Sequence, residues 1–253
     1  MNDATAPSER ARGTRATAWA KWLFIVGTVL FITGLIAPTA GTSPMIAMLL
    51  ITLASLLYIV ALICGASGLI RSGGTGGNSS ATFGWLGVAA GAGALINTII
   101  YMGGAGGAPI HDISTDTADP PQFVEVAKLR TENENPAEYA GAETAAIQKE
   151  AYPDLQPLIL LDPRTFVFNT ALQVAEDMGW EIVGTDMEAG RIEAVATTSF
   201  VGFKDDVVIR VRARSAETIV DVRSKSRIGR GDMGVNAERV RSYLAALKEA
   251  ADP

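Results

Sequence analysis

The feature that most constrains this chain is a run of residues, 45–70, that contains no charged side chain. It exceeds the roughly 20 apolar residues that a helix needs to cross a bilayer. Two further uncharged, mainly apolar stretches flank it, residues 22–37 and residues 83–102. Because long apolar runs of this kind are typical of membrane proteins, we expect three transmembrane helices in the N-terminal half.

The composition of these stretches favours anchoring over transport. The third carries Gly87 and Gly91 at the spacing that lets two helices pack closely, and also Asn97, a type that usually bonds to a neighbouring helix. None of the three contains Asp, Glu, Lys or Arg, which ion pathways use. The first could serve as a signal peptide, but the residues after Ala37 make a poor cleavage site, so we expect an anchor.

Positive residues in the short connecting segments predict the orientation of the chain. Residues 1–21 form a polar tail with four of them, and residues 71–82 contain one. Residues 38–44 and those just after 102 have none. With three spans, both positive segments lie in the cytoplasm. We therefore expect an integral protein of the bacterial inner (plasma) membrane, with a cytoplasmic N-terminus and a C-terminal domain that is periplasmic or otherwise extracytoplasmic.

A Gly-rich linker at residues 103–109 joins the membrane half to a soluble domain at residues 110–253. This domain is strongly acidic up to about residue 190 and mildly basic after it. Such opposite charges can pair within one domain or leave a basic binding face. Cys64 and His111 are the only residues of their types. The common zinc sites and an internal disulfide are therefore excluded, and we expect neither a metal nor a cofactor.

The clearest strand pattern lies at residues 207–213, where apolar side chains fill the odd positions and arginines stand at 210 and 212. A tight turn at residues 215–216 would join it to a partner strand. The register that this turn implies pairs Val211 with Val220, Ile209 with Val222, Arg210 with Asp221 and Arg214 with Glu217. Every apolar pair then lies on the inner face of the sheet, and a row of cations lies outside.

The signals around this hairpin predict an α+β domain. We expect helices at about residues 163–178 and 237–249, the first between a Pro start and a Gly end. Strands are expected at residues 180–184 and 191–200, so that residues 180–228 form an antiparallel meander. The expected fold is a mostly antiparallel sheet with both helices packed on one face.

Few side chains of the soluble domain are suited to catalysis. His111, Asp112 and Asp116 could act as a hydrolase-type general base with nearby carboxylates. Adjacent side chains in an extended segment point to opposite faces, however, which disfavours convergence on one ion or substrate. Asp205 and Asp206 form another carboxylate pair at a strand entrance, where a turn is the simpler interpretation.

The basic end of the chain can also be interpreted as a binding surface. Its candidate contact residues are Lys204, Arg210, Arg212, Arg223, Lys225, Arg227 and Arg230. No aromatic residues alternate with them and no nucleic-acid motif is present, so we expect no nucleic-acid partner. Residues 229–234 spell G-x-G-x-x-G without the βαβ context of a dinucleotide site. A sharp turn, with Asn236 capping the last helix, explains these glycines better.

Several phrases in the soluble half together resemble the bacterial domain-of-unknown-function family 1499. They lie in order along residues 110–248, at 110–116, 152–154, 179–183, 202–210 and 221–240. The three apolar stretches in front are similar to those of membrane-anchored members of that family. The resemblance implies a domain boundary near residue 110, and it implies no activity, substrate or catalytic residue.

The sequence thus favours a non-catalytic extracytoplasmic domain that binds an envelope component, such as an anionic lipid, or a partner protein through its cationic strand face. One alternative is a hydrolase-type enzyme that uses His111 with Asp112 or Asp116, or the carboxylates of Asp205 and Asp206. Another is a module that holds a small hydrophobic ligand, such as a lipid, between the sheet and the helix at 163–178. The sequence predicts no particular oligomeric state.

Overall fold

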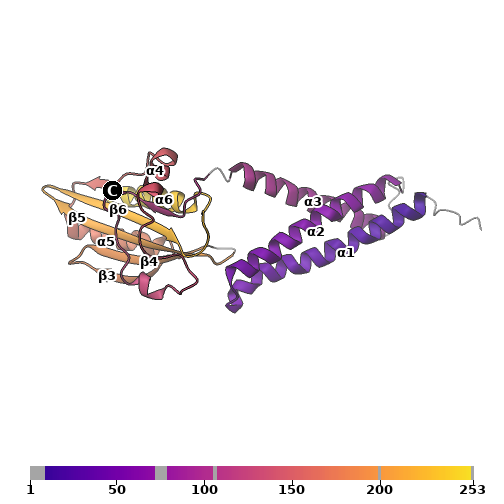
Figure 1. Cartoon of the computed structure of the whole chain (residues 1–253), viewed down its shortest axis with the longest axis horizontal. Coiled ribbons are helices and arrows are strands. Elements are labelled where there is room, and N and C mark those ends of the chain that lie inside the picture. The colour runs from indigo at the N-terminus through magenta and orange to yellow at the C-terminus, as the bar shows by residue number, and fades with distance from the viewer. Residues whose placement is uncertain (1–8, 72–78, 105–106, 199–200, 252–253) are drawn as a thin grey trace, which may run out of the picture. The chain divides into compact units, whose positions relative to one another are not determined.

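A computed structural model of the chain describes residues 9–71, 79–104, 107–198 and 201–251. The chain divides into two compact units, Met1–Gly104 and Ala105–Pro253. Helices form the first unit, and a sheet with helices forms the second (Figure 1). The boundary falls inside the expected linker, because Gly103 and Gly104 complete the last helix of the first unit.

The helices of the first unit pack through small residues. They are α1 (Glu9–Ile36), η1 (Ala37–Ala40), α2 (Pro44–Arg71) and α3 (Ser79–Gly104). Gly41 adopts a φ of 78°, which lets the chain turn after η1 into α2. Gly87 lies against the Ala61 carbonyl and Gly91 against that of Tyr58, so a Cβ at either position would crowd α2. The close approach predicted for these two glycines is therefore confirmed.

Among the described residues, two helices of this unit are long and apolar enough to cross a membrane, not the three expected. They cover Arg15–Ala40 and Pro44–Arg71. A third span was expected at 83–102, but by this measure the described apolar part of α3 is only Thr82–Ile96, about 22 Å at 1.5 Å per residue. The side chains after Ile96, including that of Asn97, lie outside the described part.

The soluble unit is built on one antiparallel sheet, as expected. Its strands are β1 (Asp112–Ser114), β2 (Leu158–Leu160), β3 (Glu181–Asp186), β4 (Arg191–Thr197), β5 (Lys204–Arg214) and β6 (Glu217–Ser226). Their order is β1-β6-β5-β4-β3, and β2 also pairs with β6. The hairpin of β5 and β6 has the predicted register, with Arg210 opposite Asp221 and Arg214 opposite Glu217. Apolar alternation together with the two-residue turn predicted this pairing.

Two helices cover one face of the sheet, which confirms the expected layers. They are α5 (Arg164–Asp177) and α6 (Val235–Ala251). Tyr243 of α6 is fully buried; its hydroxyl donates to the Ala171 carbonyl of α5 at 2.7 Å, and its ring stacks on Trp180. Val207 and Val222 face the same core from the two central strands. These core side chains lie between the sheet and α5, the place where a hydrophobic ligand was one alternative.

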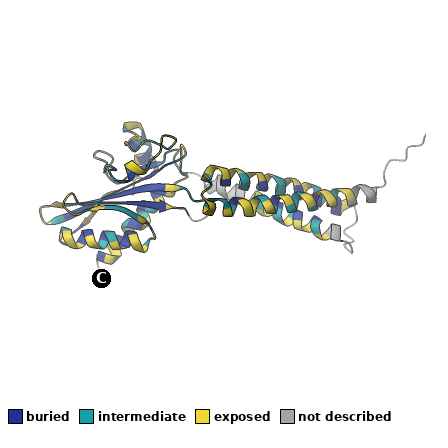
Figure 2. Cartoon of the chain, turned by 90° about the horizontal axis from the view of Figure 1, so that it is seen from below, coloured by how far each residue is buried: buried dark blue, intermediate teal, exposed yellow. Residues whose placement is uncertain are grey.

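The opposite face is covered by a long segment with little regular structure, residues 115–141, here named the covering segment. It contains one short helix, η2 (Val126–Leu129), and leads into α4 (Ala142–Ala151). Figure 2 shows buried strands between the helices on one side and this irregular part of the chain on the other. Both faces of the sheet are therefore shielded along most of β4, β5 and β6, whereas β3 is more exposed.

Glu193 of β4 holds η2 on the sheet. Its carboxylate oxygen Oε2 accepts hydrogen bonds from the backbone N–H groups of Val124, Glu125 and Val126 at 2.8 to 3.0 Å. The side chain is buried, and its negative charge lies at the N-terminal turn of η2, where backbone donors lack partners within the helix. One oxygen of this buried carboxylate is thus satisfied by the segment that covers it, and the other, Oε1, lies 2.9 Å from Arg191 Nε of the same strand.

Candidate functional site

The residues predicted to form a cationic surface fall into different environments. Arg223, Lys225 and Arg227 are buried, so the expectation that they lie on an exposed face is wrong. They point to the face of β6 that the covering segment shields, and that segment has no periodicity from which its position could be predicted. Lys204 and Arg230, in contrast, are exposed.

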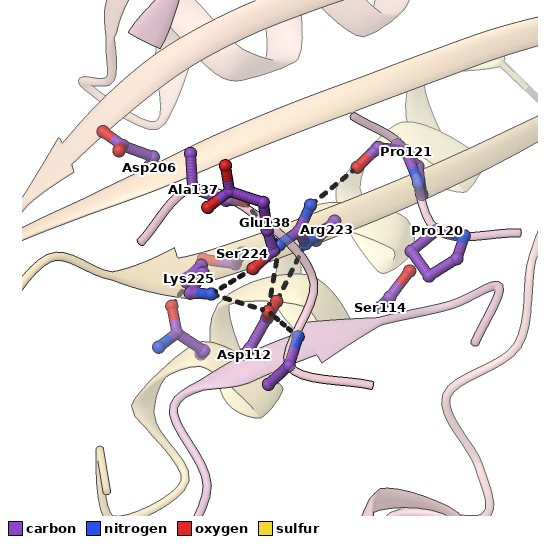
Figure 3. A network of polar contacts seen from close by, with 12 residues as sticks. Asp112, Ser114, Pro120, Pro121, Ala137, Glu138, Asp206, Arg223, Ser224 and Lys225 are labelled. Carbon is purple, nitrogen blue, oxygen red and sulfur yellow. Dashed lines mark hydrogen bonds and ion pairs between the residues drawn. The ribbon is translucent and has the colours of Figure 1, made fainter. Parts of the chain in front are cut away.

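The centre of the buried group is Asp112 on β1, which binds two cations of β6 (Figure 3). Arg223 donates from Nε to Oδ1 at 2.8 Å and from Nη2 to Oδ2 at 2.9 Å, which is the bidentate geometry of a strong pair. Lys225 Nζ lies 3.2 Å from Oδ2. Asp112 and Arg223 are both 0% exposed. Asp112 is therefore neutralised inside the protein.

A second carboxylate, Asp206 of β5, lies in the same layer. Arg130 of the covering segment contacts its Oδ2 through Nε at 2.7 Å, and Arg227 contacts its Oδ1 through Nη2 at 2.7 Å. Arg130 also donates to the Lys225 carbonyl at 3.3 Å. We name these buried groups the ion-pair layer; its members are Asp112, Arg130, Asp206, Arg223, Lys225 and Arg227.

The ion-pair layer contains four cations and two carboxylates, and backbone carbonyls of the covering segment accept further hydrogen bonds from the cations. Arg223 donates to the carbonyls of Pro121 and Ala137 at 3.1 and 2.9 Å, and Lys225 donates to that of Glu138 at 2.5 Å. The rings of Phe123 and Tyr139 lie 4.5 and 5.3 Å from the Arg223 guanidinium carbon. The layer therefore fastens the covering segment to the sheet through hydrogen bonds and cation–π contacts.

Burial also changes the acid–base properties of this layer. Desolvation lowers the pKa of Lys225, and the neighbouring carboxylate of Asp112 opposes that shift. The pKa of Tyr139 is raised to about 12, first by burial and then by the negative charge of Asp112. Its hydroxyl is buried and has no hydrogen-bond partner among the described residues. These shifts follow from enclosure by the covering segment.

The structure does not bring the candidate catalytic residues together. His111 is half-buried, with Nδ1 3.2 Å from the Arg230 carbonyl, whereas Asp112 next to it is enclosed in the ion-pair layer. Asp116 accepts the backbone N–H groups of Ala118 and Asp119 and forms a turn. The predicted divergence of adjacent side chains explains the separation of the first two.

Asp205 and Asp206 also point in opposite directions. Asp205 turns toward α6, where Arg239 Nη2 lies 2.6 Å from its Oδ2, while Asp206 belongs to the ion-pair layer. The two carboxylates therefore cannot act on one ion or substrate. Among the residues that the structure describes, no group of three metal-binding side chains occurs.

Arg210 and Arg212 lie at the margin of the covering segment and are partly exposed. Both contact Asp221, at 3.0 and 2.7 Å, and both also contact Asp116. Asp119 pairs with Arg210 at 2.9 Å. The acidic part of the domain therefore pairs with its basic part at these residues, which was one of the two interpretations of the charge asymmetry.

Two hollows adjoin the covering segment. One, of about 500 Å³, lies between Glu125 and the turn from β3 to β4. The other, of about 430 Å³, lies between residues Thr115–Ala118 and the end of α4 near Lys149. Each has more polar than apolar lining, so neither resembles the apolar pocket that usually binds a small molecule.

Sequence reasoning missed several residues of the site. Arg130, Phe123 and Tyr139 come from the covering segment, in which no pattern distinguishes them from solvated side chains. Asn236 was expected to cap α6, but Asp232 does so, accepting the N–H groups of Gly234 and Asn236 at 2.9 Å. An acidic residue a few positions before a helix was a usable signal for this cap.

The comparison with known proteins agrees with the boundary of the soluble unit. No curated protein matches the chain. A family model matches residues 112–247, more than half of the sequence and close to the 110–248 expected from the resemblance. The chain belongs to the family described as protein of unknown function, DUF1499.

Proposed function

We propose that this protein is a membrane-anchored binding module whose extracytoplasmic domain recognises an anionic envelope component or partner protein without catalysis. The observation that carries the proposal is the division among its charges. Asp112, Asp205 and Asp206 are buried in ion pairs, while Lys204 and Arg230 are exposed and form no ion pair with another described residue. The carboxylates thus support the fold, and the exposed cations are available to an anion.

The anchor is the helical unit. We propose that α3 crosses the membrane together with α1 and α2, because it packs against α2 at Gly87 and Gly91 and continues as a helix to Gly104. An odd number of crossings places the basic N-terminal tail in the cytoplasm and the soluble domain outside the bacterial plasma membrane. A periplasmic reporter fused after Pro253 should then be active, and activity of a cytoplasmic reporter alone would refute this topology.

Binding is tested by crosslinking the full-length protein in its native membranes and identifying bound proteins and lipids by mass spectrometry. The double variant Lys204→Glu with Arg230→Glu should lose the crosslinked component. Arg214→Glu with Lys248→Glu is the matched control, because it makes the same change in charge at two other exposed cations. If both double variants retain or both lose the component, Lys204 and Arg230 do not form the recognition surface.

A further inference from the structure

The chain enters the soluble domain beside one particular loop, residues 228–235, here named the entry loop. Gly107 packs against the backbone of Met233 and Gly234, leaving no room for a Cβ. The N–H of Asp232 donates to the Ile110 carbonyl at 3.2 Å, and His111 Nδ1 lies 3.2 Å from the Arg230 carbonyl. The entry loop is therefore fixed to the first residues of the domain.

The exposed side chains of the entry loop and of its neighbour Lys204 include both apolar and cationic ones. Met233 and Val235 are each 42% exposed, and Arg230 is exposed beside them in the sequence. Lys204, at the start of β5, adjoins the loop because its carbonyl accepts the N–H of Arg227 at 3.1 Å. Large apolar side chains next to cations are typical of surfaces that lie in the interface of an anionic bilayer.

Hydrogen bonds within the entry loop hold this arrangement. Met233 has a φ of 55°, a left-handed conformation that is uncommon for a residue with a side chain. The carboxylate of Asp232 stabilises it by accepting the N–H groups of Gly234 and Asn236, and the Asp232 carbonyl accepts that of Val235 at 3.1 Å. An exposed methionine is thus kept in position by a buried cap.

The covalent connection keeps the entry loop close to the anchor. Gly104 ends α3, and Gly107 is the next described residue. An extended chain covers at most about 11 Å between them, at 3.6 Å per residue. Whatever the orientation of the domain, the loop that packs on Gly107 stays near the end of α3. Such tethering raises the effective concentration of lipid at this surface.

We propose that the entry loop docks on the anionic lipid surface of the membrane that holds the anchor. Arg230 and Lys204 contact lipid phosphates, and Met233 and Val235 enter the headgroup region. This inference rests on the proposed anchorage. It identifies membrane lipid as the anionic component that the exposed cations bind. A lipid surface fits this end because a few apolar side chains flanked by cations need no hollow to bind it.

The test uses full-length protein reconstituted in lipid nanodiscs that contain either phosphatidylcholine alone or phosphatidylcholine with phosphatidylglycerol. In a Cys64→Ser background, a spin label is attached at Met233→Cys or, as control, at Leu161→Cys. Leu161 is 80% exposed and follows Leu160, which pairs with Thr218 near the other end of β6. Eight residues of strand, about 26 Å, separate Thr218 from Ser226 at the entry-loop end.

Docking predicts that, with phosphatidylglycerol, the label at 233 becomes several-fold less accessible to a water-soluble relaxing agent and more accessible to oxygen. The label at 161 should not change. Equal aqueous accessibility at both positions in these discs would overturn the proposal. If Met233→Cys fails to fold, Val235→Cys reports on the same surface and is judged by the same criterion.

Charge reversal separates this surface from others. Lys204→Glu with Arg230→Glu should return the label at 233 to water, whereas Arg214→Glu with Lys248→Glu should leave it in the lipid. Loss of the protein from the discs would mean failure of the anchor; retention in discs with an aqueous label would mean failure of docking alone. Protection of the label in native membranes, but not in discs that contain no other protein, would identify a protein partner and overturn the lipid assignment.

Discussion

Arg223 binds both carboxylate oxygens of Asp112 across the β1–β6 pair, and neither side chain is exposed. The pair lies between the sheet and the covering segment, and Arg223 uses its remaining donors on two carbonyls of that segment. A surface arginine would gain little from such contacts, but here their loss leaves a buried carboxylate. The pair therefore couples the order of an irregular segment to the sheet.

The first prediction concerns this coupling. Arg223→Met should lower the free energy of unfolding of the soluble unit by about 3–5 kcal/mol, because it leaves Asp112 buried with only Lys225 as a cationic partner. The loss is measured by unfolding the full-length protein with urea in detergent. The protease resistance of the soluble unit serves as the signal for its folded fraction.

Arg241→Met is the matched control for that variant. Arg241 pairs with Asp154 at 2.7 Å, but both side chains are about half exposed. Exposed pairs contribute about 1 kcal/mol or less, so the control should be nearly as stable as the unchanged protein. Equal losses in the two variants would show that the buried pair has no special role.

The second prediction concerns the carboxylate that holds η2. Glu193→Gln keeps the shape of the side chain but removes the negative charge from the oxygen that accepts three backbone N–H groups, so the amides of residues 124–126 should exchange with solvent faster. We expect a loss of roughly 1–3 kcal/mol in the free energy of unfolding. Hydrogen exchange read by mass spectrometry provides the measurement.

Glu188→Gln makes the same chemical change at an exposed turn residue and should leave that exchange unaltered. If exchange at residues 124–126 is the same in both variants, other contacts hold the covering segment in place.

The third prediction separates a binding module from an enzyme. His111→Ala removes one side chain whose polar contact with the described residues is a single one of 3.2 Å, so the free energy of unfolding should change by less than about 1 kcal/mol. A binding module should keep its crosslinked component in native membranes. Loss of a cellular phenotype with the fold and the crosslink intact would instead favour the hydrolase alternative.

The sequence predicted the parts of the fold that repeat a pattern. The pairing of Arg210 with Asp221 follows from alternation along two strands joined by a two-residue turn, and the helices on one face follow from capping and apolar spacing. The third span could not be decided from an uncharged stretch alone, since its described apolar part is shorter than a bilayer core.

The sequence did not predict the environment of the cations on β6. Alternation indicates that Arg223 lies opposite the helix-covered core, but it cannot indicate whether the other face meets water. That depends on the covering segment, whose position is set by single contacts such as those of Arg130 with Asp206. Contacts between residues far apart in the sequence leave no local pattern, so the ion-pair layer became visible only in three dimensions.

The last prediction concerns alkaline pH and Tyr139. Its pKa rises from 10.0 to about 12 in the folded protein, so the unfolded state loses this proton first as the pH increases. The stabilising contribution is complete below pH 10 and is lost as the pH rises toward about 12. The free energy of unfolding should therefore fall less steeply across this window in Tyr139→Phe than in the unchanged protein.

Tyr243 and Lys225 also make stability depend on pH, but they do so equally in Tyr139→Phe and in the unchanged protein. The pKa of Tyr243 is raised by burial, and that of Lys225 is lowered, so Lys225 gains its stabilising contribution as the pH rises toward 10.5. At neutral pH, Tyr139→Phe should cost little stability, because the hydroxyl it removes is buried without a described partner. Urea unfolding at a series of pH values tests both statements. Equal slopes above pH 10 would mean that Tyr139 ionises in the folded protein as readily as in the unfolded chain, and hence that the covering segment does not shield it from water.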